Sequence, residues 1–274
     1  FTILESRKQI GGTWDLFRYP GIRSDSDMHT LGFNFKPWTA AKSIADGPSI
    51  KSYLQETIAE RGLAKHIQHE HNVRSAEWSS DSSTWTVTTD HGGKTEQFCC
   101  NFLMMCSGYY NYDTPYTPDF QGQENFQGTV IHPQHWPKDL DYKGKKVVVI
   151  GSGATAMTLV PAMADEAASV TMLQRSPTYV VSRPDQDKIA NTLRKLLPDS
   201  IAYALTRFKN TQLQHFMYQR MRKQPLKMKK GLIGLVREAL GPDYDVDKHF
   251  TPKYNPWDQR LCLIPNGDLF ASIK

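Results

Sequence analysis

The sequence has few cysteines and no CxxC pair. Its 274 residues contain four cysteines, namely Cys99, Cys100, Cys106 and Cys262. The vicinal pair Cys99-Cys100 is poorly suited to an ordinary structural bridge. The missing CxxC argues against a dithiol–disulfide reductase, and the low count favours a reduced, cytoplasmic compartment.

Long hydrophobic runs are also missing. No stretch approaches the roughly 18 uninterrupted apolar residues that a membrane-spanning helix needs. The hydrophobic share of 39 %, with six Trp, twelve Tyr and twelve Phe, is typical of a globular protein. The chain begins at Phe1 without a start Met. We therefore expect a fragment, and the missing signal peptide carries no information.

Acidic residues are nearly absent from one segment. Residues 188–230 contain eleven Lys and Arg but one acid, Asp199, within a chain of net charge +5. A basic segment is compatible with nucleic acid, an anionic membrane surface or a solvated helical face. Because apolar residues are interleaved throughout, we favour ordinary helix packing and expect no nucleic-acid partner. Weak association of 188–230 with a membrane surface is the open alternative.

A glycine pattern follows a short apolar run. The run 145–150 predicts a buried parallel strand, Gly151-Ser-Gly153-Ala-Thr155-Ala156 predicts a tight turn, and 154–164 predicts a helix. Gly151 permits the turn, Gly153 admits a pyrophosphate, and Ala156 allows close helix–strand packing. Gly151, Gly153, Thr155 and Ala156 are therefore candidates for nucleotide binding; an ordinary strand-turn-helix is the alternative.

The acid that NAD sites place after the next strand is missing too. We predict that strand at 169–173, and Arg175 follows it. A guanidinium suits a ribose 2′-phosphate, so Arg175 favours NADPH. The alternative is a solvated arginine at the end of a strand.

The remaining periodicities predict an α/β protein. Residues 49–61 have helical spacing and end at Gly62. Alternation and turn residues predict further strands, and helices broken near Pro198 and Pro225 fill 187–240. The other predicted strands are 1–4, 72–78, 84–89, 98–105 and 261–264.

One string is more specific than these patterns. Residues 126–137 read Phe-x-Gly-x-x-x-His-x-x-x-Trp-Pro, which gives Phe126, Gly128, His132, Trp136 and Pro137. This string resembles the fingerprint of Baeyer–Villiger monooxygenases, which are class B flavoproteins of the flavin-containing monooxygenase superfamily. Similar segments run from Glu5 to the Trp-Asp-Gln-Arg of 257–260. The resemblance lies nearest to the ethionamide-activating subgroup of that family.

The resemblance implies a fold of two Rossmann-like dinucleotide-binding domains. Residues 1–140 would form a partial FAD-binding domain whose first strand and phosphate loop are missing. Residues 141–274 would form an NADPH-binding domain with a helical insertion at about 187–250.

Site roles are implied by the same resemblance. Glu5 is similar to the residue that binds the adenosine ribose of FAD, and Gly12, Thr13 and Trp14 would line the flavin. Asp25 corresponds to an acid beside the flavin and nicotinamide, with Asp27 as its neighbouring rival.

Arg260 resembles the arginine that stabilises negative charge on the oxygenated flavin. His132 would act on domain geometry. Each of these residues also has an ordinary interpretation: Trp14 and Trp136 as core aromatics, and His132 and His135 as structural histidines.

The implied activity depends on FAD and NADPH. It inserts one oxygen atom of O2 into ketones to give esters or lactones, and it extends to sulfides. An N- or S-hydroxylating flavin monooxygenase and an inactive nucleotide-binding fragment are the alternatives. A short-chain dehydrogenase fits less well, because Tyr142 and Lys146 precede the glycines. Gln259 replaces a lysine of many relatives, so the NADPH preference depends mainly on Arg175.

Overall fold

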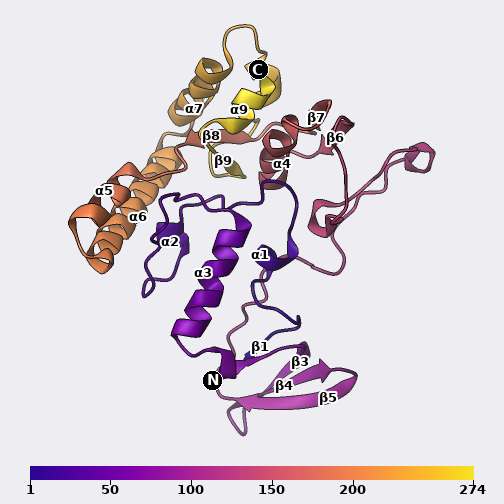
Figure 1. Ribbon diagram of the computed structural model, residues 1–274, viewed down its shortest axis with the longest axis vertical. Coiled ribbons are helices and arrows are strands. Elements are labelled where there is room, and N and C mark those ends of the chain that lie inside the picture. Colours follow the sequence, from indigo (N-terminus) through magenta and orange to yellow (C-terminus); the bar gives the residue numbers. More distant parts are fainter. The chain divides into compact units, whose positions relative to one another are not determined.

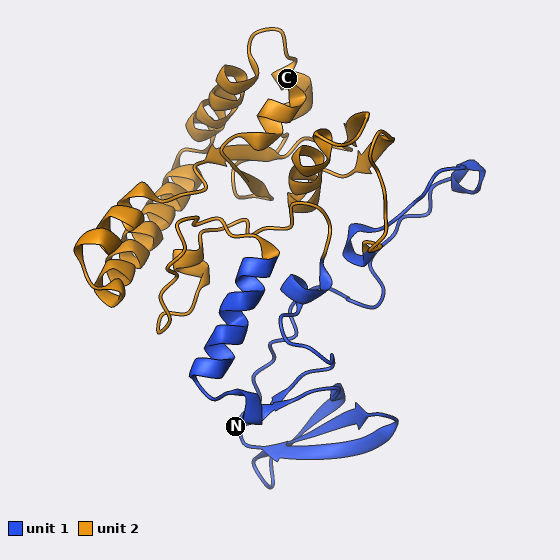
Figure 2. Cartoon of the chain, viewed as in Figure 1, with its two compact units in different colours: residues 1–17, 48–135 blue, residues 18–47, 136–274 orange.

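The chain forms two compact units in a computed structural model that describes residues 1–274. Unit 1 comprises residues 1–17 and 48–135, and unit 2 comprises 18–47 and 136–274 (Figure 2). The backbone therefore passes from one unit to the other three times. The functional division that we predict at residue 140 stays a prediction, and the sequence did not indicate that 18–47 groups with the C-terminal half. None of the helices combines the length and hydropathy needed to cross a bilayer.

Unit 1 contains a short parallel strand pair and one long helix. Strand β1 (Ile3–Leu4) pairs with β2 (Ile67–Gln68), and α1 (Thr13–Leu16) follows the Gly11-Gly12 turn. Helix α3 (Gly47–Glu60) confirms the predicted helix, and it buries Ile50, Tyr53 and Thr57. Those positions are three and four residues apart, so they share one helix face. Three 3-10 turns complete the unit: η1 (Ala64–His66), η2 (Gln123–Asn125) and η3 (Pro133–His135).

Unit 1 also contains an antiparallel sheet of three strands. Its strands are β3 (Asn72–Ser79), β4 (Thr84–His91) and β5 (Lys94–Cys100), in that order (Figure 1). The predicted strand 98–105 is wrong in its extent. The Gly92-Gly93 turn starts β5 at Lys94, opposite His91, and the strand ends at Cys100. Beyond it, the side chains of Phe102, Met104 and Met105 are exposed and the backbone pairs with no strand.

Unit 2 contains the predicted strand-helix-strand unit. Strand β6 (Lys146–Ile150) leads into α4 (Ala154–Ala164), and β7 (Ser169–Leu173) pairs parallel with β6. Strand β8 (Tyr179–Arg183) forms a second parallel pair with β9 (Leu261–Pro265). The sequence predicted β9 but not β8. The α/β class is confirmed. Two complete Rossmann domains are not, because no parallel sheet here exceeds two strands and the full fold has six.

Helices pack on the β8–β9 pair to make the main core of unit 2. The pair is contacted by α4, α7 (Pro225–Leu240) and α9 (Asp268–Ile273). Helices α6 (Asp199–Lys223) and α8 (Val246–Phe250) pack on α7, and α5 (Lys188–Leu196) and α2 (Met28–Leu31) pack on α6 (Figure 1). The breaks near Pro198 and Pro225 are confirmed, since proline cannot donate an amide to a continuing helix. Tyr179, Ile264 and Leu269 are almost fully buried in this core.

Several cations of the basic segment are engaged within unit 2. Arg207 donates to three backbone carbonyls, those of His29, Thr30 and Gly32. Lys209 pairs with Asp187 at 2.6 Å, and α6 also supplies an ion pair to Asp258. These contacts favour the packing interpretation. Weak association with an anionic membrane surface stays a prediction, which sedimentation with anionic vesicles at low and high salt tests.

Candidate functional site

The glycine loop of unit 2 has the geometry of a phosphate-binding turn. Gly151 adopts φ 141°, in the region that glycine tolerates, and its amide donates to the carbonyl of Leu173 at 2.8 Å. Gly153 is the N-cap of α4, and no side chain caps this helix. Its first-turn amides are therefore available to an anion, and the helix dipole favours one there.

Residues 19–21 run along α4, from Thr155 in its first turn to Ala162 in its last. A Cβ on Gly21, whose φ is 75°, would lie 2.8 Å from the Cβ of Ala162 and 3.3 Å from Thr158. Glycine at position 21 thus allows the two segments to touch. Tyr19 hydrogen bonds with Thr155; burial raises the pKa of Tyr19, and this bond opposes the shift only in part. Ala156 is buried beneath the loop, as its small size predicts.

Arg260 lies against the same loop. It directly precedes β9, and its carbonyl accepts hydrogen bonds from the hydroxyls of Tyr254, at 2.8 Å, and Thr178, at 3.3 Å. Its side chain is exposed, and a Cβ on Gly153 would overlap the guanidinium Nη1. The backbone of Arg260 is therefore fixed while its cation lies over the glycine at the start of α4.

Asp25 lies in the same neighbourhood as Arg260. Burial raises the pKa of the Cys262 thiol, a hydrogen bond with Thr178 and the charge of Arg260 lower it, and the charge of Asp25 raises it. Both charges therefore act on one buried thiol, although Asp25 and Arg260 are 235 positions apart. The two residues that carry the implied chemistry thus both lie near Cys262.

Asp27, the alternative to Asp25 for the acid beside the flavin and nicotinamide, has a different environment. Its carboxylate accepts from the amide of Thr30 at 3.0 Å and so caps α2. It also accepts from Asn210 and Gln214, each at 3.0 Å. Asp27 is thus used in holding α2 against α6, whereas the side chain of Asp25 is exposed.

Arg175 follows β7 and borders the glycine loop. Its side chain is exposed and makes no hydrogen bond or ion pair. The neighbouring Ser176 carbonyl accepts from Ser152 Oγ at 3.0 Å, which ties this strand end to the glycine loop. A cation in this position is accessible to a ligand held at the start of α4.

In unit 1, Glu5 lies at the end of β1. Its amide donates to Gln68 at 2.9 Å, and its carbonyl accepts from His71 at 3.0 Å. One carboxylate oxygen, Oε1, accepts from the amide of Arg7 at 2.9 Å, and the side chain is half-buried. A carboxylate held at a strand end in this way suits a ribose hydroxyl.

The Gly11-Gly12 turn follows and leads into α1. Gly11 and Gly12 have φ 117° and 49°, and the amide of half-buried Trp14 donates to Gly11 at 2.9 Å. The Thr13 hydroxyl lies 3.0 Å from that of Tyr112. Sequence reasoning missed Tyr112, for which no motif gave a signal.

A buried ion network supports this turn. Asp15 is 4 % exposed and pairs with Arg7 at 2.6 Å and with Lys51 at 2.5 Å. Arg7 also donates to the carbonyl of Gly12 at 3.1 Å. Burial alone would raise the pKa of Asp15, but the contacts with Lys51 and Arg7 outweigh it and hold the pKa below its usual value. Because Lys51 is 36 positions from Asp15 in the sequence, spacing alone did not reveal this network.

The fingerprint string has a compact local structure. The ring of Phe126 occupies the space that a Cβ on Gly128 would need, which accounts for glycine two positions after the aromatic residue. Nδ1 of His132 accepts from the amide of Gln134 at 3.2 Å, and burial, followed by the charge of His135, lowers the pKa of His132.

The string ends in unit 2. His135 donates to the carbonyl of Tyr112 at 2.9 Å, whereas Trp136 packs edge-on against Tyr142. The carbonyl of Pro137 accepts from the amide of Leu140 at 3.4 Å. The passage between the two compact units falls between His135 and Trp136. The fingerprint thus joins one unit to the other.

Known proteins resemble the chain over its whole length. EthA, an FAD-containing monooxygenase of Mycobacterium tuberculosis (strain ATCC 25618 / H37Rv), is 56 % identical over 100 % of this chain and 56 % of its own length. EthA of Mycolicibacterium smegmatis gives the same values. The chain thus spans little more than half the length of these curated relatives.

Solved structures share the fold. The oxidized steroid monooxygenase bound to NADP matches with a TM-score of 0.78 at 21 % identity, over 99 % of this chain and 59 % of that one. The cyclohexanone monooxygenase from Rhodococcus sp. Phi1 bound to NADP+ matches with a TM-score of 0.71 at 22 % identity, over 100 % and 58 %. The family described as FMO-like, flavin-binding monooxygenase-like, matches residues 44–235. That span is more than half of the chain, and the chain therefore belongs to the flavin-binding monooxygenase-like family.

Proposed function

We propose that the protein containing this chain is an FAD- and NADPH-dependent Baeyer–Villiger monooxygenase. The observation that carries the proposal is the position of Arg260, whose guanidinium lies over the glycine loop, while the charges of Arg260 and Asp25 both act on the buried Cys262 thiol. A permanently charged guanidinium can stabilise developing negative charge without titrating. Asp25 would orient that cation.

The residues present fit NADPH and the part of an FAD site that this chain carries. The uncapped start of α4, Gly153 and Thr155 would hold the pyrophosphate of NADPH, and Arg175 its 2′-phosphate. Glu5, Gly12, Thr13 and Trp14 would hold FAD, which supplies the oxygen-activating chemistry when bound. The fingerprint residues would couple the two units during turnover. They are Phe126, Gly128, His132, Trp136 and Pro137.

The proposed reaction balances as one ketone, O2, NADPH and a proton giving one ester, NADP+ and water. NADPH supplies the two electrons, one oxygen atom enters between the carbonyl carbon and its neighbour, and the other leaves as water. The substrate class is a ketone, with sulfides as a second class.

The first test uses Arg260→Met in the protein that contains this chain. Ester formation from cyclohexanone under labelled O2 should fall about 100-fold or more, as it does when one donor to a developing oxyanion is removed. NADPH-driven flavin reduction should change little. Lys253→Met, an exposed cation in the same loop, is the matched control. Sulfide or amine oxygenation by the unaltered protein without any ester would instead favour the hydroxylating branch.

The second test concerns Arg175. We expect Arg175→Ala to weaken NADPH binding about 10- to 100-fold, the range for a hydrogen bond to a charged group, and to leave NADH binding unchanged. Fluorescence titration measures both affinities. Arg183→Ala, an exposed arginine at the end of β8, is the control. Equal losses for NADPH and NADH would contradict a 2′-phosphate role.

A further inference from the structure

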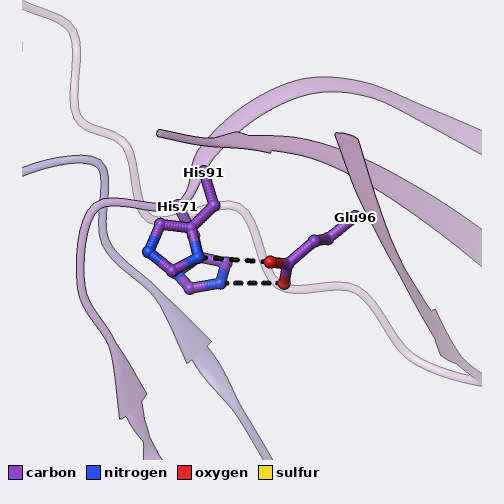
Figure 3. A group of neighbouring side chains, drawn as sticks. All are labelled: His71, His91 and Glu96. Carbon is purple, nitrogen blue, oxygen red and sulfur yellow. Dashed lines mark hydrogen bonds and ion pairs between the residues drawn. The ribbon is translucent and has the colours of Figure 1, made fainter. Parts of the chain in front are cut away.

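Two histidines and a glutamate meet at one end of the β3–β5 sheet, within unit 1 (Figure 3). Asn72 pairs with Asp90 across β3 and β4, which places His71 beside His91. Glu96 faces Thr89 on β5, so it lies diagonally from His91 on the same side of the hairpin. One ligand atom from each of His71, His91 and Glu96 lies within 4.8 Å of the others.

The separations suit a single metal ion. Glu96 Oε2 lies 3.2 Å from His71 Nε2, and Glu96 Oε1 lies 3.2 Å from His91 Nδ1 (Figure 3). Ligands bound tetrahedrally at 2.0–2.2 Å from zinc lie about 3.4 Å apart. The two imidazole rings are 4.1 Å apart between centroids. Little movement would therefore be needed to place an ion between the three groups.

A hydrogen bond prepares His71 as a ligand. Its Nδ1 donates to the carbonyl of His69 at 2.7 Å, which leaves Nε2, directed at Glu96, as the ring nitrogen that a metal ion would take. Metal-binding histidines typically donate their second ring nitrogen to a carbonyl or carboxylate in this way. His71 is 5 % exposed, so its orientation is also fixed by packing, partly against the edge of Phe98.

A metal-free cluster in which both imidazole rings are protonated explains these contacts less well than a bound metal ion does. Two imidazolium ions at this separation would repel each other, and Glu96 could neutralise one of the two charges. A divalent cation replaces both protons and uses both neutral rings and the carboxylate. Imidazole and carboxylate ligands suit borderline ions such as Zn²⁺.

We propose that His71, His91 and Glu96 bind one divalent transition-metal ion, represented by Zn²⁺, with solvent completing the coordination. The ion would clamp the β4–β5 hairpin to the segment before β3, whose His71 amide donates to Glu5. None of the three metal ligands is a residue proposed above to bind a nucleotide, and the role of the ion is structural.

The test is zinc titration of the untagged 274-residue chain after treatment with a chelator. Calorimetry with ZnCl₂ should give one site per chain. His91→Gln and Glu96→Gln should each lower the zinc affinity at least tenfold, and the double variant should abolish saturable binding. His215→Gln, an exposed histidine on α6, should bind zinc as the unaltered chain does.

His91 and Glu96 are 44 % and 42 % exposed, so both variants should fold, which circular dichroism verifies before titration. Failure of the unaltered chain to bind zinc saturably would overturn the proposal. Equal affinities in the unaltered chain and in both variants would do the same. Ketone oxidation and flavin content are not readouts here, so the result is independent of the proposed monooxygenase activity.

Discussion

Replacing Asp15 with asparagine should destabilise unit 1. The change keeps the size of the side chain but removes the anion that Arg7 and Lys51 share at 2.6 and 2.5 Å. Two cations would then remain beside the Gly11-Gly12 turn with no carboxylate between them.

The expected loss in the free energy of unfolding follows from the burial of Asp15. Removing one partner of a buried ion pair costs about 3–5 kcal/mol. The side chains of Arg7 and Lys51 are each 25 % exposed, so water screens part of their charge. Asparagine also retains one acceptor oxygen. We therefore expect a loss of about 2–3 kcal/mol at pH 7.

The deficit should depend on pH. The pKa of Asp15 in the folded protein lies below its usual value. A depressed carboxyl pKa contributes stability above the unfolded pKa of about 3.9, and that contribution is lost as the pH falls through the folded pKa. The difference between the unaltered chain and Asp15→Asn should therefore narrow from about pH 5 downwards.

Hydrogen exchange read by mass spectrometry measures the effect within unit 1. The amides of α3, which carries Lys51, should exchange about 30- to 160-fold faster in Asp15→Asn, which is 2–3 kcal/mol expressed as a ratio. Asp81→Asn, at an exposed turn of the same unit, is the control. Exchange of α3 unchanged at pH 7, or a deficit that persists undiminished at pH 3, would refute the reasoning.

Three further predictions concern the core of unit 2. Tyr179→Phe removes the 2.6 Å hydrogen bond from the hydroxyl to the carbonyl of Tyr254 and should cost about 1 kcal/mol in urea unfolding, whereas Tyr109→Phe, at a residue 88 % exposed, should cost nothing measurable. Burial raises the pKa of Tyr179 to about 12, so the tyrosinate absorbance that the unaltered chain shows and Tyr179→Phe lacks should develop only above pH 11. A difference that develops near pH 10 would contradict this core. Leu269→Ala, at a residue that is 0 % exposed, should lower the free energy of unfolding by about 2–5 kcal/mol. Leu226→Ala, at a residue that is 76 % exposed, should lower it by about 0.5 kcal/mol or less.

Local patterns predicted the strand-helix-strand unit at β6–β7 well. The run 146–150, the glycines and the apolar helix act within about 30 residues, where period and turn chemistry are decisive. Strand β8 was missed because Tyr179–Arg183 follows a proline and pairs with β9, some 80 residues later. A strand stabilised by so distant a partner has little local signal.

In the candidate site, too, features that depend on neighbouring residues were predicted, and features that depend on distant residues were missed. The glycine loop and Arg175 were predicted from short-range spacing, but the ion network at Asp15 depends on Lys51, 36 residues away. Asp27 could have been separated from Asp25, because an aspartate before Met28-His29-Thr30 is a helix N-cap signal.

The three passages of the backbone between the compact units bear on how the protein can be dissected. A single proteolytic cut within one passage would leave two covalent links, so the products would stay connected under native conditions. Neither unit is a continuous stretch of sequence, so a gene segment that encodes the whole of either unit also encodes part of the other. Studying unit 1 alone requires joining residue 17 to residue 48 by a linker and ending the chain at residue 135, and studying unit 2 alone requires removing 1–17 and joining residue 47 to residue 136.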